Sequence, residues 1–267
     1  MTQAQQQTPP GGGAPQSERS TTPRVAHQWG MVIDSDRCTG CQACVVACQA
    51  ENNVTINDEE TFQRHRAKEW IRIERYWEGE FPNVKARFLP VLCQHCQNAP
   101  CEPVCPVYAI YHSTDGLNVQ VYNRCVGTRY CGNNCQWNVR FFNFSEPEWP
   151  EPLTSQLNPD VTVRSKGLIE KCTFCIHRLN RAKREERRTG QAIRDGDVQP
   201  ACVQACPTEA LIFGDLDDAN SRVSRLAHDQ REYQLLDHLG TEPVVFYLKK
   251  VDPNAQVSAR PSSGEQH

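Results

Sequence analysis

Fifteen cysteines in four closely spaced groups limit most strongly what this 267-residue chain can fold into. The groups are Cys38, Cys41, Cys44 and Cys48; Cys93, Cys96, Cys101 and Cys105; Cys125, Cys131 and Cys135; and Cys172, Cys175, Cys202 and Cys206. No cysteine is left over. In the short group, CVGTRYCGNNC, Thr128 stands where the first group, CTGCQACVVAC, has its second cysteine. Cysteines at such regular intervals are typical of metal ligands.

The spacing favours iron-sulfur clusters over the other uses of cysteine. The first group has the C-x2-C-x2-C-x3-C run of bacterial-type ferredoxins, in which the fourth thiolate binds a second cluster. Disulfides fit poorly with an odd count of cysteines and repeated C-x2-C pairs. Zinc also binds four thiolates. However, the C-x2-C-x2-C triple, together with Pro106 and Pro207 after the last cysteine of two groups, favours iron-sulfur ligation.

The composition predicts a small apolar core. Only 38% of the residues are hydrophobic, the chain has 18 prolines and 15 glycines, and its mean hydropathy is -0.64. No stretch approaches the roughly 20 apolar residues that span a bilayer, so we expect no membrane crossing by this chain. Residues 1–29 lack the apolar segment of an export signal, and we expect a disordered arm there. A cofactor protein can still be exported with a partner that carries the signal.

The order of the cysteine groups predicts an α+β fold with little regular structure, built from two nested ferredoxin-like dicluster modules. After the arm, the expected parts are an outer module at residues 30–92 and 160–216, an inserted inner module at 93–159, a C-terminal helix and strand at 217–250, and a disordered tail at 251–267.

Several local patterns predict individual elements. Asp115-Gly116 separates an apolar-rich run from the alternating LNVQV and indicates a hairpin. MVID before Cys38 and EALIFGDL after Cys206 are expected to form strands of the outer module. A further strand is expected from Trp70 to Tyr76, and apolar FLPVL leads into the second cysteine group.

Two helices are expected in the second half of the chain. IHRLNRAKREERRTG should form one that ends near Gly190, and a second should run from Asp217 or Asp218 to Gly240, before the closing strand PVVFYLKK. Residues 164–188 hold nine Lys or Arg against three Glu, although the net charge of the chain is -3. A solvated helix face explains this excess best, ahead of docking to an acidic partner or lipid headgroups, and then nucleic acid.

Thr128 predicts that one cluster is incomplete. A neutral hydroxyl is a poor ligand for iron, so Cys125, Cys131 and, by crossing between groups, Cys105 are expected to hold a 3Fe-4S cluster. The alternative is a fourth iron held by water or by Thr128 itself. His95 could hydrogen-bond a sulfide, although a structural role is preferred. We find no nucleophile with a paired base and no phosphate or nucleotide motif, so no small-molecule substrate is expected.

With four cysteine groups in this order and a closing FGDLDDANSRVSRL segment, residues 30–250 resemble the four-cluster iron-sulfur subunits of the complex iron-sulfur molybdoenzyme family. Within that family, NRCVGTRYCGNNC and CQHCQNAPCEPVCP are most similar to the iron-sulfur component of alternative complex III, a quinol:electron-acceptor oxidoreductase. That component is often fused to a large molybdopterin-enzyme-like domain, which is not found in these 267 residues.

The resemblance implies which cysteines share a cluster. It groups them into a first set (Cys38, Cys41, Cys44 and Cys206), a second set (Cys48, Cys172, Cys175 and Cys202) and a third set (Cys93, Cys96, Cys101 and Cys135), each for a 4Fe-4S cluster, and a fourth set (Cys105, Cys125 and Cys131) for the 3Fe-4S cluster.

The resemblance also implies a function without catalysis by this chain itself. The four clusters would relay electrons in a quinol-oxidising respiratory or photosynthetic complex, with the 3Fe-4S end nearest the membrane. The expected partners are a polytopic quinone-binding membrane subunit, a large molybdopterin-enzyme-like subunit and c-type cytochrome subunits. The expected place is the periplasmic face of a bacterial inner membrane. The first alternative is the iron-sulfur subunit of a molybdopterin reductase or dehydrogenase, such as a polysulfide-reductase-like enzyme. Two further alternatives are a free ferredoxin and a zinc-stabilised interaction protein.

Overall fold

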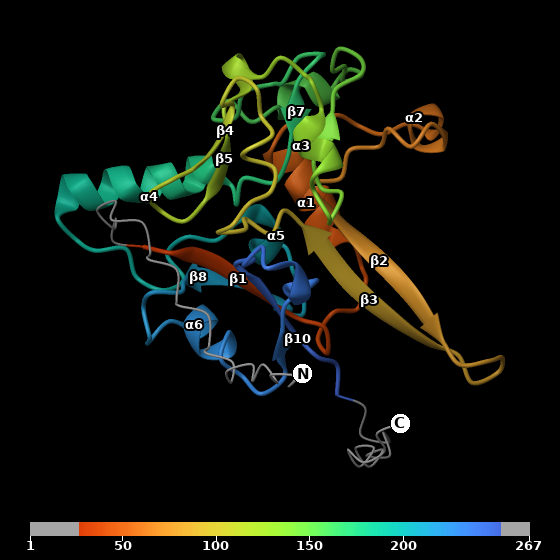
Figure 1. Ribbon diagram of the computed structural model, residues 1–267, viewed down its shortest axis with the longest axis vertical. Helices are drawn as coiled ribbons and strands as arrows, with labels where there is room; N and C mark the ends of the chain where they lie inside the picture. The colour runs from red at the N-terminus through yellow and green to blue at the C-terminus, as the bar shows by residue number, and fades with distance from the viewer. Residues whose placement is uncertain (1–26, 252–267) are drawn as a thin grey trace, which may run out of the picture.

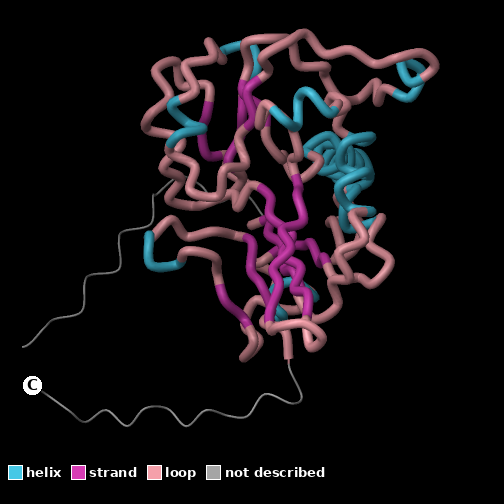
Figure 2. The backbone as a smooth tube through the Cα atoms, turned by 90° about the vertical axis from the view of Figure 1, so that its right-hand side faces the viewer, coloured by secondary structure: helices cyan, strands magenta, loops and turns pink. Residues whose placement is uncertain are grey.

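The computed structural model describes residues 27–251, in which loops make up most of the chain (Figure 2). A four-stranded sheet in the order β8-β1-β10-β9 forms one end of the molecule (Figure 1). Its strands are β1 (Trp29–Asp34), β8 (Leu211–Asp215), β9 (Glu232–Tyr233) and β10 (Val245–Leu248). β1 pairs parallel with β10 and antiparallel with β8. All six residues of β1 are buried, so this strand is the centre of the core.

Three predicted strands are therefore confirmed, because MVID, EALIFGDL and PVVFYLKK supply β1, β8 and β10. The predicted arm 1–29 extends too far. Trp29 begins β1, is buried and stacks on Phe213 with ring centroids 5.6 Å apart. The rest of that arm, and the predicted tail from residue 252, lie outside the described residues.

The hairpin predicted at Asp115-Gly116 is confirmed, and the strand predicted from Trp70 to Tyr76 forms one arm of a second hairpin. β2 (Ile71–Glu78) pairs with β3 (Lys85–Leu92), and this long hairpin projects from the body of the molecule (Figure 1). β4 (Ile110–His112) pairs with β5 (Asn118–Gln120) around Asp115-Gly116. Gly116 has φ +75°, a value that glycine adopts without strain.

Short elements surround the cysteine loops. They are α1 (Ala43–Glu51), α2 (Glu59–Gln63), α3 (Tyr130–Asn133), α5 (Ala201–Gln204), the strand pair β6 (Phe141–Phe142) and β7 (Ile169–Glu170), and the 3-10 turns Tyr122–Arg124, Leu153–Gln156 and Asp237–Leu239. Because α1 and α5 belong to the first and last cysteine groups and pack together, the fold brings these two distant groups side by side.

The basic helix is confirmed as α4 (Ile176–Thr189), and it ends at Gly190 with φ +71°. The predicted helix from Asp217 or Asp218 to Gly240 is wrong. That range holds one short α-helix, α6 (Arg222–Leu226), which is capped by the Ser221 hydroxyl that accepts from the Ser224 amide at 3.0 Å, and the 3-10 turn Asp237–Leu239. The chain then turns to pair Tyr233 with Tyr247 in the sheet, so pairing of β9 with β10 overrides helix propensity.

Candidate metal centres

No disulfide joins any of the fifteen cysteines, all of which lie within residues 27–251, so the disulfide alternative is wrong. Their surroundings differ in exposure. Cys41 is exposed, and Cys48, Cys172, Cys175 and Cys202 are buried. Buried thiols resist ionisation unless an anion is stabilised by hydrogen bonds, cations or a metal. The local environment of each set therefore shows what kind of group it can hold.

The first set is brought together across more than half of the chain. Burial raises the pKa of the Cys44 thiol to about 12, and the nearby thiolates of Cys38, Cys206 and Cys41 contribute to this rise. Cys206 comes from the last cysteine group, and its electrostatic interaction with Cys44 indicates that the fold brings these two groups near each other. Because Cys41 is exposed, this set lies at the protein surface.

The second set is enclosed by protein. Burial raises the pKa of Cys48 well above its ordinary value, and the thiolates of Cys172, Cys202 and Cys175 add to this. The Asn52 side-chain amide donates to the Sγ of Cys48 at 3.5 Å and of Cys175 at 3.7 Å. Both hydrogen bonds favour the thiolate form, which is the form that binds iron.

The third set lines a cavity. Burial raises the pKa of Cys96, with further contributions from the thiolates of Cys93, Cys101 and Cys135. All four line one small cavity together with Asn118, Trp137, Arg140 and other neighbours. Among residues 27–251, no three His, Cys, Asp or Glu side chains converge on a single ion. Four thiols around one cavity fit a group of several atoms, such as an iron-sulfur cube.

The fourth set is linked to its surroundings by backbone amides. The amide of Ala109 donates to Cys105 Sγ at 3.2 Å, and that of Ile169 donates to Cys125 Sγ at 3.5 Å. Cys131 is buried, and Cys105 and Cys125 are half-buried. That these three cysteines bind the same cluster stays a prediction.

The backbone repeats itself between the first and third cysteine groups. Gly40 and Gly127 both have φ +71°, and Gln42 and Arg129 have φ +62° and +65°. Gly40 and Gln42 flank Cys41, and Gly127 and Arg129 flank Thr128. Thr128 therefore occupies the same position in its loop as Cys41 does in the first loop. Both side chains are exposed.

A second repeat follows the C-P dipeptides. The Ala109 amide donates to Cys105 Sγ, and the Ala210 amide donates to Cys206 Sγ, each at 3.2 Å. The residues before these alanines, Tyr108 and Glu209, have φ +51° and +49°. The two halves of the chain thus build the same amide-to-sulfur contact, which is one of the factors that set a cluster's reduction potential.

Comparison with known proteins agrees with this geometry. Residues 84–149 match the model of the 4Fe-4S dicluster domain, and residues 29–50 match the model of a 4Fe-4S binding domain. The chain is also 44% identical to the iron-sulfur cluster-binding subunit of menaquinone reductase from Nitratidesulfovibrio vulgaris, over 84% of this chain and 89% of that one. The chain belongs to the ferredoxin-like 4Fe-4S dicluster iron-sulfur subunits.

Further relatives of this iron-sulfur subunit come from different oxidoreductases. It is 37% identical to the iron-sulfur subunit 1 of an Hdr-like menaquinol oxidoreductase from Archaeoglobus fulgidus, over 85% of both chains. It is also 37% identical to the iron-sulfur subunit of arsenate respiratory reductase from a Shewanella species, over 82% of this chain and 95% of that one. The family thus comprises electron-relaying subunits of multisubunit oxidoreductases.

Several charged residues around the cysteines escaped sequence reasoning. The Nε2 of His177 lies 2.6 Å from Glu51 Oε1, and the His177 side chain is mostly buried. Arg178 Nε also donates to Glu51 Oε1 at 2.6 Å, and it is the main cause that lowers the pKa of Glu51 to about 2. In the sequence, these interactions are indicated only by the location of the residues, each of which lies two or three positions after a cysteine.

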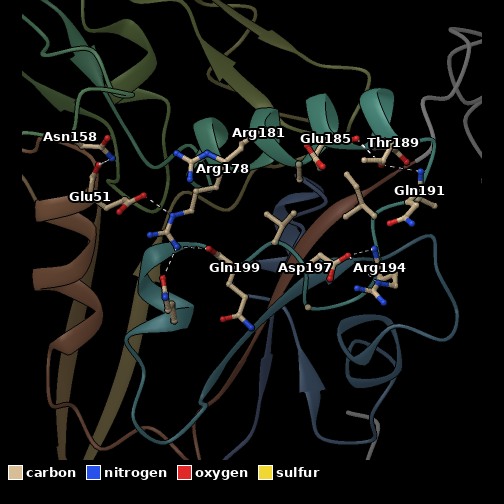
Figure 3. Close-up of a pocket in the computed structure, with 17 residues that line it drawn as sticks. Glu51, Asn158, Arg178, Arg181, Glu185, Thr189, Gln191, Arg194, Asp197 and Gln199 are labelled. Atoms are coloured by element: carbon tan, nitrogen blue, oxygen red, sulfur yellow. Dashed lines mark hydrogen bonds and ion pairs between the residues drawn. The ribbon is translucent and has the colours of Figure 1, made fainter.

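Glu51 and Arg178 also line the end of a wide cleft beside α4 (Figure 3). Arg178 reaches across it and donates at 2.8 Å to the main-chain oxygen of Gln199 and to the side chain of Gln204. Farther along, Arg194 pairs with Asp197. The charges that line this cleft are largely satisfied within the chain.

Proposed function

We propose that this chain relays electrons through three 4Fe-4S clusters and one 3Fe-4S cluster, between a quinone-binding membrane subunit and a large molybdopterin-enzyme-like subunit. The observation that carries the proposal is the cavity enclosed by Cys93, Cys96, Cys101 and Cys135, which three separate stretches of the sequence build around one point. Each bound cluster would take up and pass on one electron.

The first three sets are the proposed ligands of the 4Fe-4S clusters. In each set, one thiol has the other three as its electrostatic neighbours. The fourth set is the proposed ligand set of the 3Fe-4S cluster. Support for the missing corner comes from the loop position of Thr128, which matches that of Cys41 and offers a hydroxyl in place of a thiolate.

The residues of the chain itself hold, shield and connect the clusters. Asn52 and the amides of Ala109 and Ala210 supply hydrogen bonds to ligand sulfur atoms. Buried side chains such as Trp137 keep water from the third set. A lower effective dielectric strengthens these interactions, so their number and direction tune the potential of each cluster.

The surface near the fourth set supports its proposed place at the membrane subunit. Val107, Tyr108, Val126 and Tyr130 are all exposed and lie within three positions of Cys105, Cys125 or Cys131 in the sequence. Exposed apolar side chains gathered near one site are typical of a protein interface. No helix within residues 27–251 has the length and apolar character to cross a bilayer.

The relatives favour a reductase or menaquinone-linked complex over alternative complex III. Two of them belong to menaquinone or menaquinol enzymes and one to arsenate respiratory reductase. We therefore propose the iron-sulfur subunit of a molybdopterin reductase or dehydrogenase linked to the quinone pool. Alternative complex III, with c-type cytochrome partners, is the second candidate because CVGTRYCGNNC has threonine at the vacant position.

Metal analysis of the purified complex separates these two candidates. Molybdenum or tungsten in stoichiometric amount is expected for the first, and its absence together with haem c would favour the second. In either complex, we place the subunit on the periplasmic face of a bacterial inner membrane, to which it would be exported together with a partner. We divide it into two nested modules: an outer module of residues 30–92 and 160–216, and an inner module of residues 93–159. Zinc in place of iron in the purified protein would overturn the proposal.

A further inference from the structure

Two cations inside the protein have no carboxylate partner within residues 27–251. Lys171 is fully buried, and its Nζ donates to the main-chain oxygens of Asn118 at 2.6 Å and Cys172 at 2.9 Å. Arg140 is 6% exposed. Its guanidinium donates to Cys101 Sγ at 3.5 Å, to Asn118 Oδ1 at 3.2 Å and to Gln120 Oε1. All these acceptors are neutral oxygen atoms except the sulfur of Cys101, which can become an anion by losing its proton.

A buried cation without an anion is costly, so its counter-charge has to be found nearby. The contrast with Arg164 is clear, because this equally buried side chain pairs with the Glu170 carboxylate. Arg140 instead donates to the sulfur of Cys101 at 3.5 Å, and this sulfur is anionic when it binds iron. The anions that balance this interior are therefore cysteine ligands.

The two cations connect three of the cysteine sets. Lys171 directly precedes Cys172 of the second set. Arg140 contacts Cys101 of the third set, and its charge also interacts with Cys131 of the fourth set. Asn118 in β5 joins them, since its main-chain oxygen accepts from Lys171 and its side-chain oxygen accepts from Arg140.

We propose that Arg140 and Lys171 are built-in counter-charges that raise the reduction potential of the cluster held by the third set, and so stabilise an electron in the middle of the relay. This inference rests on the proposed function. Reduction adds one negative charge to a cluster, and a fixed cation in a buried, weakly screened site favours that charge. Arg140, with a direct hydrogen bond to a ligand sulfur, should have the larger effect.

Gln120→Glu gives the sharpest test. Gln120 is buried, its Oε1 accepts from Arg140 and its Nε2 has no hydrogen-bond partner. Glutamate has the same shape, so it keeps the acceptor, removes the unsatisfied amide and supplies the carboxylate that Arg140 lacks. We expect EPR-monitored redox titrations of the purified complex to give at least a tenfold lower equilibrium constant for reduction of the third cluster. This corresponds to a decrease of about 59 mV in the reduction potential of a one-electron couple.

Gln204→Glu is the matched control. Gln204 is exposed and also accepts from an arginine, but that arginine, Arg178, already pairs with Glu51. Because solvent and salt screen the added charge, the equilibrium constant for reduction of the third cluster should change by no more than about twofold. Arg140→Gln should lower the potential like Gln120→Glu, and Arg140→Lys should restore most of it.

Unchanged potentials in Gln120→Glu, with full iron content, would overturn the inference. If Arg140→Gln fails to retain iron, Gln120→Glu still decides, because it leaves the cation in place. A protein that contains no iron-sulfur clusters would contradict the proposed function itself, whereas clusters with unmoved potentials contradict only the role of the cations.

Discussion

The ring of His95 stacks on the ring of Phe174, with centroids 4.1 Å apart and planes inclined by 22°. Both residues are buried and stand directly before the second cysteine of a C-x2-C pair, Cys96 and Cys175, respectively. Both have positive φ values, 45° and 51°. The stack thus joins the loops of the second and third sets through equivalent positions of the two halves of the chain.

Phe174→Ala should destabilise this junction. Phe174 also packs edge-on against Phe213, and removing a buried phenyl ring costs about 3–5 kcal/mol of unfolding free energy. We expect a lower thermal unfolding temperature and reduced iron content. Phe81→Ala, at a site that is 91% exposed, is the control and should change neither. Equal stability of the two variants would show that the stack does not support the metal sites.

The buried pair Arg164 and Glu170 should be a second stability determinant. Each side chain is 1% exposed, and Arg164 also donates to the main-chain oxygens of Asn52 and Asn53. Glu170→Gln leaves the guanidinium without its anion, so we expect a loss of about 3–5 kcal/mol. Denaturant titration measures it.

The matched control for that variant is Asp160→Asn. Asp160 pairs with Arg181 on the surface, where both side chains are more than half exposed. Its loss should cost less than about 1 kcal/mol. Similar losses in Glu170→Gln and Asp160→Asn would contradict the importance of the buried pair.

Gly127→Ala should damage the loop of the fourth set. Gly127 has φ +71°, and a Cβ there would lie 2.3 Å from the main-chain oxygen of Gly167. Gly196 has φ +86° but open space around it, so Gly196→Ala carries only the left-handed strain of about 1–2 kcal/mol. We expect Gly127→Ala, but not Gly196→Ala, to lose the 3Fe-type EPR signal. Retention of that signal in Gly127→Ala would indicate that the 3Fe-4S cluster is not bound at the loop of the fourth set.

Much of this architecture could be predicted from the sequence because its signals are local. The Asp115-Gly116 turn and the Gly190 stop each depend on a few neighbouring residues, and the elements that they predict are present. The helix predicted up to Gly240 failed because Tyr233 pairs with Tyr247, a contact that no local pattern encodes. Arg140 was missed for the same reason, since only the fold brings it to Cys101.

EPR spectroscopy of the air-oxidised protein decides whether the fourth set holds a 3Fe-4S cluster. Three thiolates with Thr128 at the position of a fourth predict a 3Fe-type signal in the wild type, and loss of that signal in Thr128→Cys as the site becomes a 4Fe-4S cluster of lower potential. Thr154→Cys, in a surface turn away from the cysteine runs, should keep the wild-type spectrum. Absence of a 3Fe-type signal from the oxidised wild-type protein with full iron content would contradict a 3Fe-4S cluster at the fourth set.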